Sequence, residues 1–354
     1  MCAIGQPHPH LGPLPSRERG GEFHSPALQG AGTAPSPPRA GEGVEERAGR
    51  GVVWKVDRFA SHDGPGIRTL AYFKGCPLRC AWCSNPEGQT PEPLLVLQGP
   101  NCTGCGLCVE ACPSRALQIR PAAEGAGAAV QIERSRCDSC GDCTDSCPTE
   151  ALQVWGKRQS VGEMVELLER DRSIHARSGG GLTCTGGDPV YQEHFLVELM
   201  DACRQRGIHT AVETSAYADE DHFRPVVERV DWLFIDLKHL DPTAHLHWTG
   251  KSNDLILHNA RLASSILKAR GKALVVRQVV VPGVNDGPNI SDLADFLCSL
   301  PLVTTVELLP YHSYGAHKYD LLGRRYGLGD LTPPSVEAMD DYRTLLKARR
   351  LPVV

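Results

Sequence analysis

Three cysteines, Cys76, Cys80 and Cys83, have C-x3-C-x2-C spacing and carry the first chemical signal in the chain. Thiolates this close in sequence can bind three irons of a [4Fe–4S] cube, so the fourth iron receives no ligand from the motif. An iron with an open position can bind and act on a small molecule, whereas a fully ligated cluster only passes electrons. Short cysteine patterns also occur in zinc sites, but the cysteine-rich context favours a cluster that takes part in chemistry.

Two further runs repeat the C-x2-C-x2-C-x3-C-P spacing of bacterial ferredoxins: Cys102, Cys105, Cys108 and Cys112, then Cys137, Cys140, Cys143 and Cys147. In two-cluster ferredoxins the fourth cysteine of each run ligates the other cluster. We therefore expect Cys147 to complete the cluster of the first run and Cys112 that of the second. Both clusters would be closed and suited to electron transfer. Zinc binding is the alternative, but two complete runs ending in Cys-Pro favour [4Fe–4S] clusters.

The overall composition narrows the class of protein. The chain has 354 residues, of which 41% are hydrophobic, enough for roughly two domains. A net charge of −5 argues against nucleic-acid and anionic-membrane partners. No apolar run approaches the ~20 residues that span a bilayer, and the N-terminus lacks the hydrophobic region of a secretory signal. Fifteen clustered cysteines then predict metal ligation in a reducing cytoplasm, not a disulfide framework.

Composition also divides the chain into four parts. Residues 1–50 are rich in Pro, Gly, Arg and Ser without an apolar period, which predicts a disordered tail or an upstream stretch included by a wrong start. Residues 51–90 contain the first part of the core and its cysteine loop. Residues 91–157 form a cysteine-dense insert, and residues 158–354 contain the rest of the core.

Short apolar runs alternate with helical patterns beyond residue 157. Strands are expected at 69–73, 181–185, 209–215, 232–238, 273–281 and 305–311. Helices are expected near 191–206, 219–229, 253–270, 289–299 and 334–349, and Ser160 with Glu163 forms a capping box that opens a further one. About six strand–helix units predict an α/β fold, a partial (β/α)6 TIM-like barrel with an inserted two-[4Fe–4S] ferredoxin-like domain. A doubly wound sheet is the alternative.

Several longer motifs lie in register with the cysteine loop: His62–Thr69 (HDGPGIRT), Ser84–Glu87 (SNPE), Asp236–His239 (DLKH) with Thr249-Gly250, Val281–Asp286 (VPGVND) and Leu308–His312 (LLPYH). The cysteine loop with Trp82 before its last cysteine resembles the radical S-adenosylmethionine (SAM) superfamily. Together the motifs resemble the glycyl-radical-enzyme activating enzymes, in the branch with a two-cluster ferredoxin insert. The resemblance covers about residues 53–350.

The resemblance implies a reaction, its cofactors and its partners. Members of this family bind SAM to the open iron through the methionyl amine and carboxylate. One electron then cleaves the sulfonium to methionine and a 5′-deoxyadenosyl radical, which takes a hydrogen atom from a glycine Cα. The glycine lies in a C-terminal loop of a partner glycyl radical enzyme of the lyase, dehydratase, decarboxylase or aryl-succinate synthase type. Three [4Fe–4S] clusters and SAM are the implied cofactors, and flavodoxin or ferredoxin is the implied reductant.

The resemblance also assigns roles to residues near the strand ends. Gly186, Gly187 and Asp188 fall where the family has Gly-Gly-Glu, which grips the SAM amine, although Asp is one methylene shorter than Glu. The same tripeptide also suits an ordinary turn. Trp82 is implied in backbone contacts to adenine or in packing over the cluster.

The remaining rim residues are implied in binding the other parts of SAM. Glu213 and Asp236 are expected near SAM or a nearby cation, with Lys238, Arg277 and His312 around the SAM carboxylate and ribose. A lone Lys or His at a strand end is usually a solvated or satisfied residue, but several such groups at one rim favour a site. The turn at Asp63–Gly66 is expected beside the glycine-loop channel, although turn chemistry alone would explain it.

Two other functions remain open at this point. A polyferredoxin would carry electrons without chemistry, but the missing fourth ligand and the long βα region disfavour it. Another radical SAM maturase would modify a peptide by a different route, which the His62–Thr69 motif disfavours.

Overall fold

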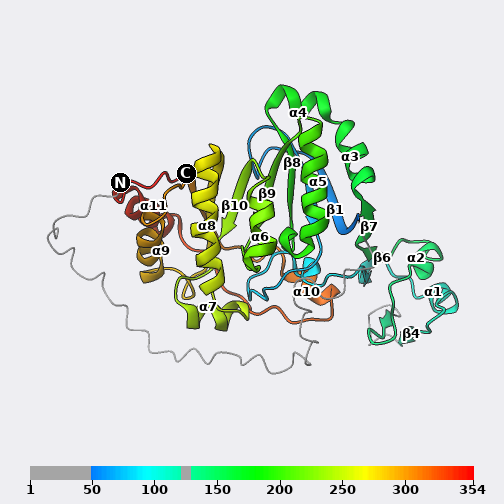
Figure 1. Cartoon of the computed structure of the whole chain (residues 1–354). Helices are drawn as coiled ribbons and strands as arrows, with labels where there is room; N and C mark the ends of the chain where they lie inside the picture. Colours follow the sequence, from blue (N-terminus) through cyan, green and yellow to red (C-terminus); the bar gives the residue numbers. More distant parts are fainter. Residues whose placement is uncertain (1–48, 121–128) are drawn as a thin grey trace, which may run out of the picture.

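A computed structural model describes residues 49–120 and 129–354, in which an eight-stranded sheet is flanked by helices (Figure 1). The strand order is β12-β11-β10-β9-β8-β2-β1-β7. Six strands are parallel: β2 (Arg68–Phe73), β8 (Gly181–Gly186), β9 (His209–Thr214), β10 (Trp232–Asp236), β11 (Ala273–Val280) and β12 (Thr305–Pro310). β1 (Arg50–Ala60) and β7 (Lys157–Ser160) extend one edge in antiparallel pairing.

The strand order decides between the two predicted folds. Each parallel strand pairs with the next one along the chain, without the reversal that a doubly wound sheet requires. Within the described residues β12 and β7 are the two edges and do not pair with each other, so the barrel is open. The partial (β/α)6 barrel is therefore confirmed and the doubly wound alternative is wrong. The prediction for residues 1–50 lies outside the described residues, except that β1 begins at Arg50.

The helices follow the strands as crossovers, and local sequence signals explain their ends. They are α3 (Val161–Glu169), α4 (Arg172–Ser178), α5 (Glu193–Gln205), α6 (Glu220–Val227), α7 (Pro242–Thr249), α8 (Asp254–Arg270), α9 (Pro288–Cys298), α10 (Ala316–Leu321) and α11 (Val336–Ala348). The capping box is present: Glu163 N donates to Ser160 Oγ at 3.2 Å, and Ser160 N donates to Glu163 Oε2 at 2.7 Å. α8 ends at Gly271, whose φ of +65° suits glycine.

Alternation along the strands separates the core from the barrel interior. Leu182, Val212, Ile235 and Val276 are fully buried in one apolar cluster with helix residues such as Leu196. The residues next to these in each strand point to the opposite face of the sheet, because successive side chains in a strand alternate between faces. That second face holds the polar residues described below, so the pleat itself presents them to the interior.

The cysteine-dense insert has two small antiparallel pairs, β3 (Leu94–Leu97) with β6 (Leu152–Trp155) and β4 (Leu117–Arg120) with β5 (Ala129–Ile132). The short helices α1 (Leu107–Glu110) and α2 (Asp142–Asp145) complete it. The insert projects from the barrel at its β7 edge (Figure 1). Arg134 Nη2 joins it to α10 by donating to the Leu321 carbonyl oxygen at 3.4 Å.

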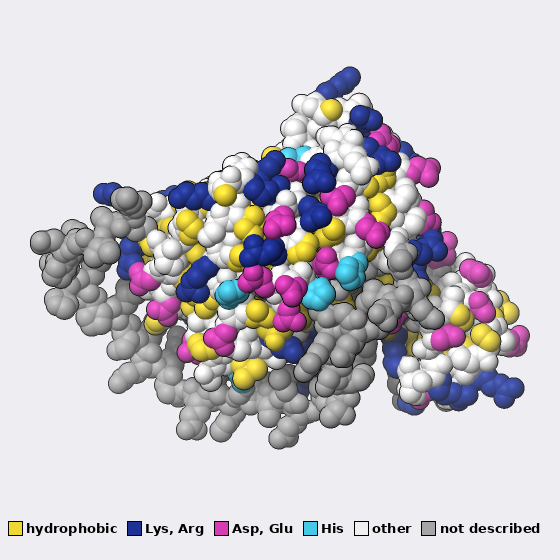
Figure 2. All heavy atoms as spheres, viewed as in Figure 1, with side chains coloured by type: hydrophobic (Ala, Val, Ile, Leu, Met, Phe, Trp, Pro, Cys, Tyr) yellow, Lys and Arg dark blue, Asp and Glu magenta, His cyan; other side chains and the backbone are white. Residues whose placement is uncertain are grey.

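The surface in Figure 2 carries Lys, Arg, Asp and Glu side chains interspersed over the helices, without a field of one sign. Among the helices of the described residues, none has the length and apolarity to cross a membrane.

Candidate active site

The cysteine loop follows the C-terminal end of β2 and places its three thiols in partly buried positions. Burial raises the pKa of Cys76, Cys80 and Cys83, and that of Cys80 to about 12. Thiols in such a setting stay protonated on their own, whereas bound cations deprotonate the thiols that ligate them. The donor set therefore fits a positively charged multi-iron group better than it fits free thiolates.

Contacts from distant elements fix the loop. Arg79 N donates to the Thr249 carbonyl oxygen at 2.7 Å, and Ala81 N donates to that of Trp248 at 3.0 Å, so α7 holds the middle of the motif. Trp82 is buried in a small cluster with Val281 and Tyr311. This packing is an ordinary reason for a tryptophan here, and contact of its backbone with adenine stays a prediction.

Arg277 lies at the centre of an ionic network in the barrel interior. Its Nε donates to Glu307 Oε2 at 2.8 Å, Nη1 to Glu213 Oε1 at 2.9 Å and Nη2 to Asp63 Oδ1 at 3.2 Å. The guanidinium also lies over the Phe234 ring, 4.4 Å from its centroid. Burial lowers the pKa of Arg277, but the surrounding carboxylates outweigh this effect and raise it overall. One cation thus joins three strands and the Asp63 loop.

Within this network, the carboxyl group of Glu213 has a raised pKa. It accepts a hydrogen bond from Thr185 Oγ1 at 2.6 Å. Burial raises the pKa of Glu213 to about 8, with Arg277 opposing the rise and Asp63 adding to it. Perturbed carboxyls inside an open barrel are typical of functional sites.

Asp236 and Lys238 form a second ionic pair beside the cysteine loop. Lys238 Nζ lies 3.0 Å from Asp236 Oδ2. Burial opposes protonation of Lys238, but the neighbouring Asp236 carboxylate outweighs this effect and raises its pKa overall. The other carboxylate oxygen, Asp236 Oδ1, is buried without a hydrogen-bond partner among the described residues. Since buried polar atoms normally have partners, this oxygen is suited to accept a donor from a ligand.

The Gly186-Gly187-Asp188 segment packs against the cysteine loop. A Cβ on Gly187 would lie 2.4 Å from the carbonyl oxygens of Gly75 and Gly88, so only glycine allows this approach. Gly187 N donates to the Phe73 carbonyl oxygen at 2.8 Å.

The Asp188 carboxylate has protein partners of its own. It is only 2% exposed and accepts hydrogen bonds from Thr214 Oγ1 at 2.7 Å and from Ser215 N and Oγ at 3.0 and 2.6 Å. These bonds tie the end of β8 to the end of β9. Contact of this carboxylate with a SAM amine stays a prediction.

His312 follows β12 and is exposed, with its ring stacked on Tyr314 at 4.5 Å between centroids. Within the described residues it makes no hydrogen bond to the Arg277 network. Sequence reasoning missed Thr185 and Glu307 as members of that network. The alternation of side chains along each strand could have revealed Glu307. It pairs in register with Arg277 on the adjacent parallel strand, so the two side chains lie on the same face of the sheet.

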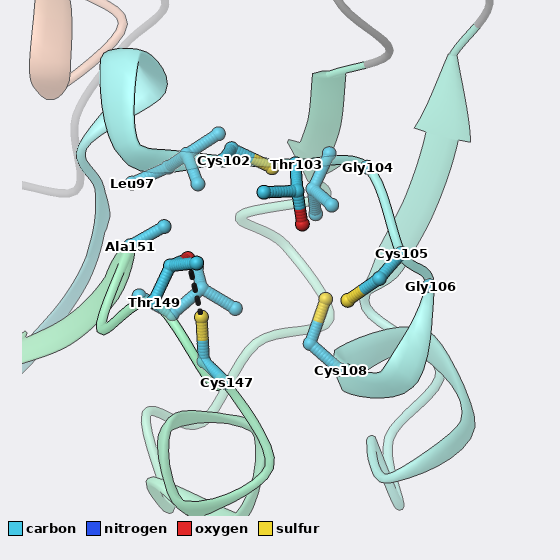
Figure 3. A pocket seen from close by; sticks show the side chains of 12 residues that line it. Leu97, Cys102, Thr103, Gly104, Cys105, Gly106, Cys108, Cys147, Thr149 and Ala151 are labelled. Atoms are coloured by element: carbon cyan, nitrogen blue, oxygen red, sulfur yellow. Dashed lines mark hydrogen bonds between the residues drawn. The ribbon is translucent and has the colours of Figure 1, made fainter.

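The eight insert cysteines divide into two sets, each around its own pocket. One pocket is lined by Cys102, Cys105, Cys108 and Cys147, and Figure 3 shows these thiols arriving from the loop before α1, from α1 and from the segment after α2. The other pocket is lined by Cys112, Cys137, Cys140 and Cys143. Across the described residues, no three His, Cys, Asp or Glu side chains converge on a point where one metal ion would fit.

Two protein-family models match the chain. The model of a 4Fe-4S dicluster domain matches residues 101–151. The model of the Radical SAM superfamily matches residues 136–297.

Individual relatives match most of the chain. The trans-4-hydroxy-L-proline dehydratase activating enzyme of Clostridioides difficile is 36% identical over 301 residues, which cover 84% of this chain and 96% of that protein. The isethionate sulfite-lyase activating enzyme of Desulfovibrio desulfuricans is 37% identical over 288 residues, covering 80% and 90%. A solved domain of a pyruvate-formate lyase-activating enzyme from Bacteroides vulgatus is 31% identical and covers 50% of this chain and 98% of its own, with a TM-score of 0.42.

Proposed function

Because this chain belongs to the radical SAM activating enzymes of glycyl radical enzymes, we propose that it binds SAM at a [4Fe–4S] cluster held by Cys76, Cys80 and Cys83. When bound and reduced, that cluster supplies the electron that cleaves the SAM sulfonium. The observation that carries the proposal is the placement of these cysteines beside Asp236 Oδ1, which lacks a hydrogen-bond partner in the part of the chain that the structure describes, at the rim of an open barrel.

The rim residues suit the charges of SAM. Asp236 Oδ1 would accept from the methionyl ammonium, and Lys238 beside it would balance the methionyl carboxylate. Arg277 has five N–H donors, three of which are engaged with carboxylates, and it holds Glu213 toward the interior. Trp82, Val281 and Tyr311 form an apolar wall that would exclude water from a reactive radical. We include His312, Gly186 and Gly187 among the residues proposed to bind SAM.

The substrate of the reaction is a glycine of a partner protein. The relatives named above activate a dehydratase and a sulfite-lyase, and a third activates the 4-hydroxyphenylacetate decarboxylase of Clostridioides difficile. We therefore infer a glycyl radical enzyme as the partner of this chain. Its C-terminal glycine loop would enter between β12 and β7, the two edge strands, which do not pair with each other among the described residues.

The insert would pass electrons from a flavodoxin or ferredoxin to the SAM-binding cluster. In support, each insert pocket brings four cysteines together, the number that closes a [4Fe–4S] cluster. The chain would then carry three clusters. A Cys140→Ala variant that kept the wild-type rate of 5′-deoxyadenosine formation with a flavodoxin reductant would contradict this relay.

The proposed site can be tested with the reconstituted chain under anaerobic conditions. Dithionite and SAM should yield 5′-deoxyadenosine with the wild type and with Cys298→Ala, a matched control at the end of α9. Cys83→Ala should lose at least about a hundredfold of this activity, because the open cluster loses a ligand. Product formed at the wild-type rate by Cys83→Ala, or none from a wild type with all clusters loaded, would contradict the proposal.

A further inference from the structure

The loop that follows β10 carries Lys238, and buried asparagine side chains hold its backbone. Just beyond the last residue of β10, Leu237 N donates to the Arg277 carbonyl oxygen of β11 at 3.0 Å. One residue further, Asn285 joins the two chains instead. Its Nδ2 donates to the carbonyl oxygens of Lys238 and Val279, both at 2.8 Å. A side-chain amide thus links the two chains where β10 has ended.

The partners of Asn285 fix the orientation of its amide. Its Oδ1 accepts from Val281 N at 2.7 Å, and a backbone N–H can only donate. Its Nδ2 faces two carbonyl oxygens, which can only accept. A flip of the amide would place like groups against each other at all three contacts. Asn285 is fully buried, so these bonds are not exchanged for bonds to water.

Two further buried asparagines hold the next residues of the loop. Asn253 Nδ2 donates to the carbonyl oxygens of His239 and Leu240 at 2.9 and 2.7 Å. Asn289 Oδ1 accepts from Leu240 N at 2.8 Å, and its Nδ2 donates to the Asn285 carbonyl oxygen at 2.9 Å. With the Asn285 bond, three consecutive carbonyl oxygens of this loop are bonded to asparagine amides.

The side chain that this backbone directs is that of Lys238. Its Nζ lies 3.0 Å from Asp236 Oδ2, at the rim where the methionyl end of SAM is proposed to bind. A lysine has a compact ammonium on a flexible stem, without a preferred binding geometry of its own. The backbone from which the stem leaves therefore decides where the ammonium lies. Asn285 holds the carbonyl oxygen of that same residue.

We propose that Asn285 is a positioning residue for SAM binding: by holding the Lys238 backbone it places the Lys238 ammonium where it meets the carboxylate of SAM. The inference rests on the proposed function, because it needs SAM at the barrel rim. Asn285 is bonded to backbone groups of three other residues, so it acts through Lys238 and not through contact with SAM. Without it, binding of SAM would have to pay for ordering the Lys238 loop.

The test is a double-mutant cycle on the affinity for SAM. Equilibrium dialysis of the full, cluster-loaded chain without a reductant measures the Kd, because SAM is not cleaved under these conditions. We expect Asn285→Ala to raise this Kd about tenfold, the effect of losing its hydrogen bonds to the loop. In the Lys238→Met background, Asn285→Ala should change the Kd by less than about twofold, since the group that it positions is absent.

Asn259→Ala is the matched control. Asn259 is also fully buried, and its Nδ2 also donates to two carbonyl oxygens, those of Ala216 and Ala218 at 2.8 and 2.7 Å, in the loop after β9. Its effect on the Kd should be the same with and without Lys238→Met, because independent sites are additive. This comparison separates positioning of Lys238 from a general loss of structure.

Equal effects of Asn285→Ala in the two backgrounds would overturn the inference, and so would an unchanged Kd in the single variant. If Asn285→Ala does not load iron, Asn253→Ala replaces it, because it frees the next two carbonyl oxygens of the same loop. Its effect should likewise vanish in Lys238→Met, and an equal effect in both backgrounds would again overturn the inference. A wild type that carries all its iron but binds no SAM would contradict the proposed function instead.

Discussion

Arg277 shows how a single side chain can organise a barrel interior. Three carboxyl groups, those of Asp63, Glu213 and Glu307, share the guanidinium of Arg277, a residue that is only 9% exposed. Like charges this close are stable only because the cation lies between them. Removal of the cation would leave these partly buried carboxyl groups without their ionic partner.

We predict that Arg277→Met lowers the free energy of unfolding by about 3–5 kcal/mol, the usual cost of breaking a buried ion pair. The matched control is Arg170→Met, whose exposed pair with Glu166 at 3.5 Å should contribute less than about 1 kcal/mol. Denaturant unfolding of both variants checks the prediction. Equal losses of stability in the two variants would show that the buried Arg277 network stabilises the fold no more than one exposed ion pair does.

The acidity of Glu213 predicts a pH dependence of stability in the absence of SAM. Its pKa is raised from the ordinary 4.5 to about 8, so between these values the folded protein keeps a proton that the unfolded chain releases. The stabilisation that Glu213 contributes to the folded protein is fully present below its pKa in the unfolded chain. The free energy of unfolding then falls as the pH rises from that value to the folded-state pKa.

Glu213→Gln should remove that slope. We expect the pH slope of the free energy of unfolding between pH 5 and pH 8 to become less negative by up to about 1.4 kcal/mol per pH unit. Unfolding curves of both proteins at several pH values measure it. A variant with the wild-type slope would mean that Glu213 is ionised throughout.

At the scale of elements, two loops after neighbouring parallel strands meet at the site. The loop after β8 contributes Gly187, and the loop after β2 contributes Gly75, whose carbonyl oxygen accepts from Asp188 N at 2.7 Å. Parallel strands β2 and β8 end at the same edge of the sheet, which brings their loops together. Close backbone packing, more than any one side chain, sets the position of the cysteine loop.

Gly187→Ala tests this packing. The added Cβ would meet two backbone oxygens at 2.4 Å, so the loops must separate, at a cost of about 1–3 kcal/mol. We expect a more than tenfold loss of 5′-deoxyadenosine formation. Gly99→Ala is the control, because its Cβ would have nothing within 4 Å. Full activity of Gly187→Ala would show that the loop contact does not position the cysteines.

At the scale of the whole molecule, each of the two pockets of the insert brings together cysteines from both of its runs. Cys147 lies with the first-run thiols and Cys112 with the second-run thiols. Each proposed cluster would therefore connect distant parts of the insert, and cluster binding would stabilise its small core.

Iron content in double variants can test the crossed ligation. Cys147→Ala should lose about four of about twelve irons per chain, one cluster of the proposed three. Adding Cys105→Ala should remove no more iron, since both residues serve one cluster, whereas adding Cys140→Ala should remove a second cluster. The reverse pattern, with further loss from Cys105→Ala but none from Cys140→Ala, would show uncrossed ligation.

The sequence alone determined the local features of this protein. Cysteine spacing, the Ser160 capping box and strand periodicity each depend on residues close in the chain, so they could be read without coordinates. The six parallel strands were predicted to within about two residues at each end. α7 and α10 were missed because they are short, and β1 because its strand pairing joins residues as distant as Arg50 and Ser160.

Only the tertiary structure decided which groups meet. Arg277 contacts Asp63 across 214 positions of the chain, and Arg324 reaches Gln89 across 235. The bonds of Asp188 to Thr214 and Ser215 likewise depend on how β8 and β9 pair. Such contacts follow from the stacking of strands and loops in three dimensions, and residue type and spacing carry no record of them.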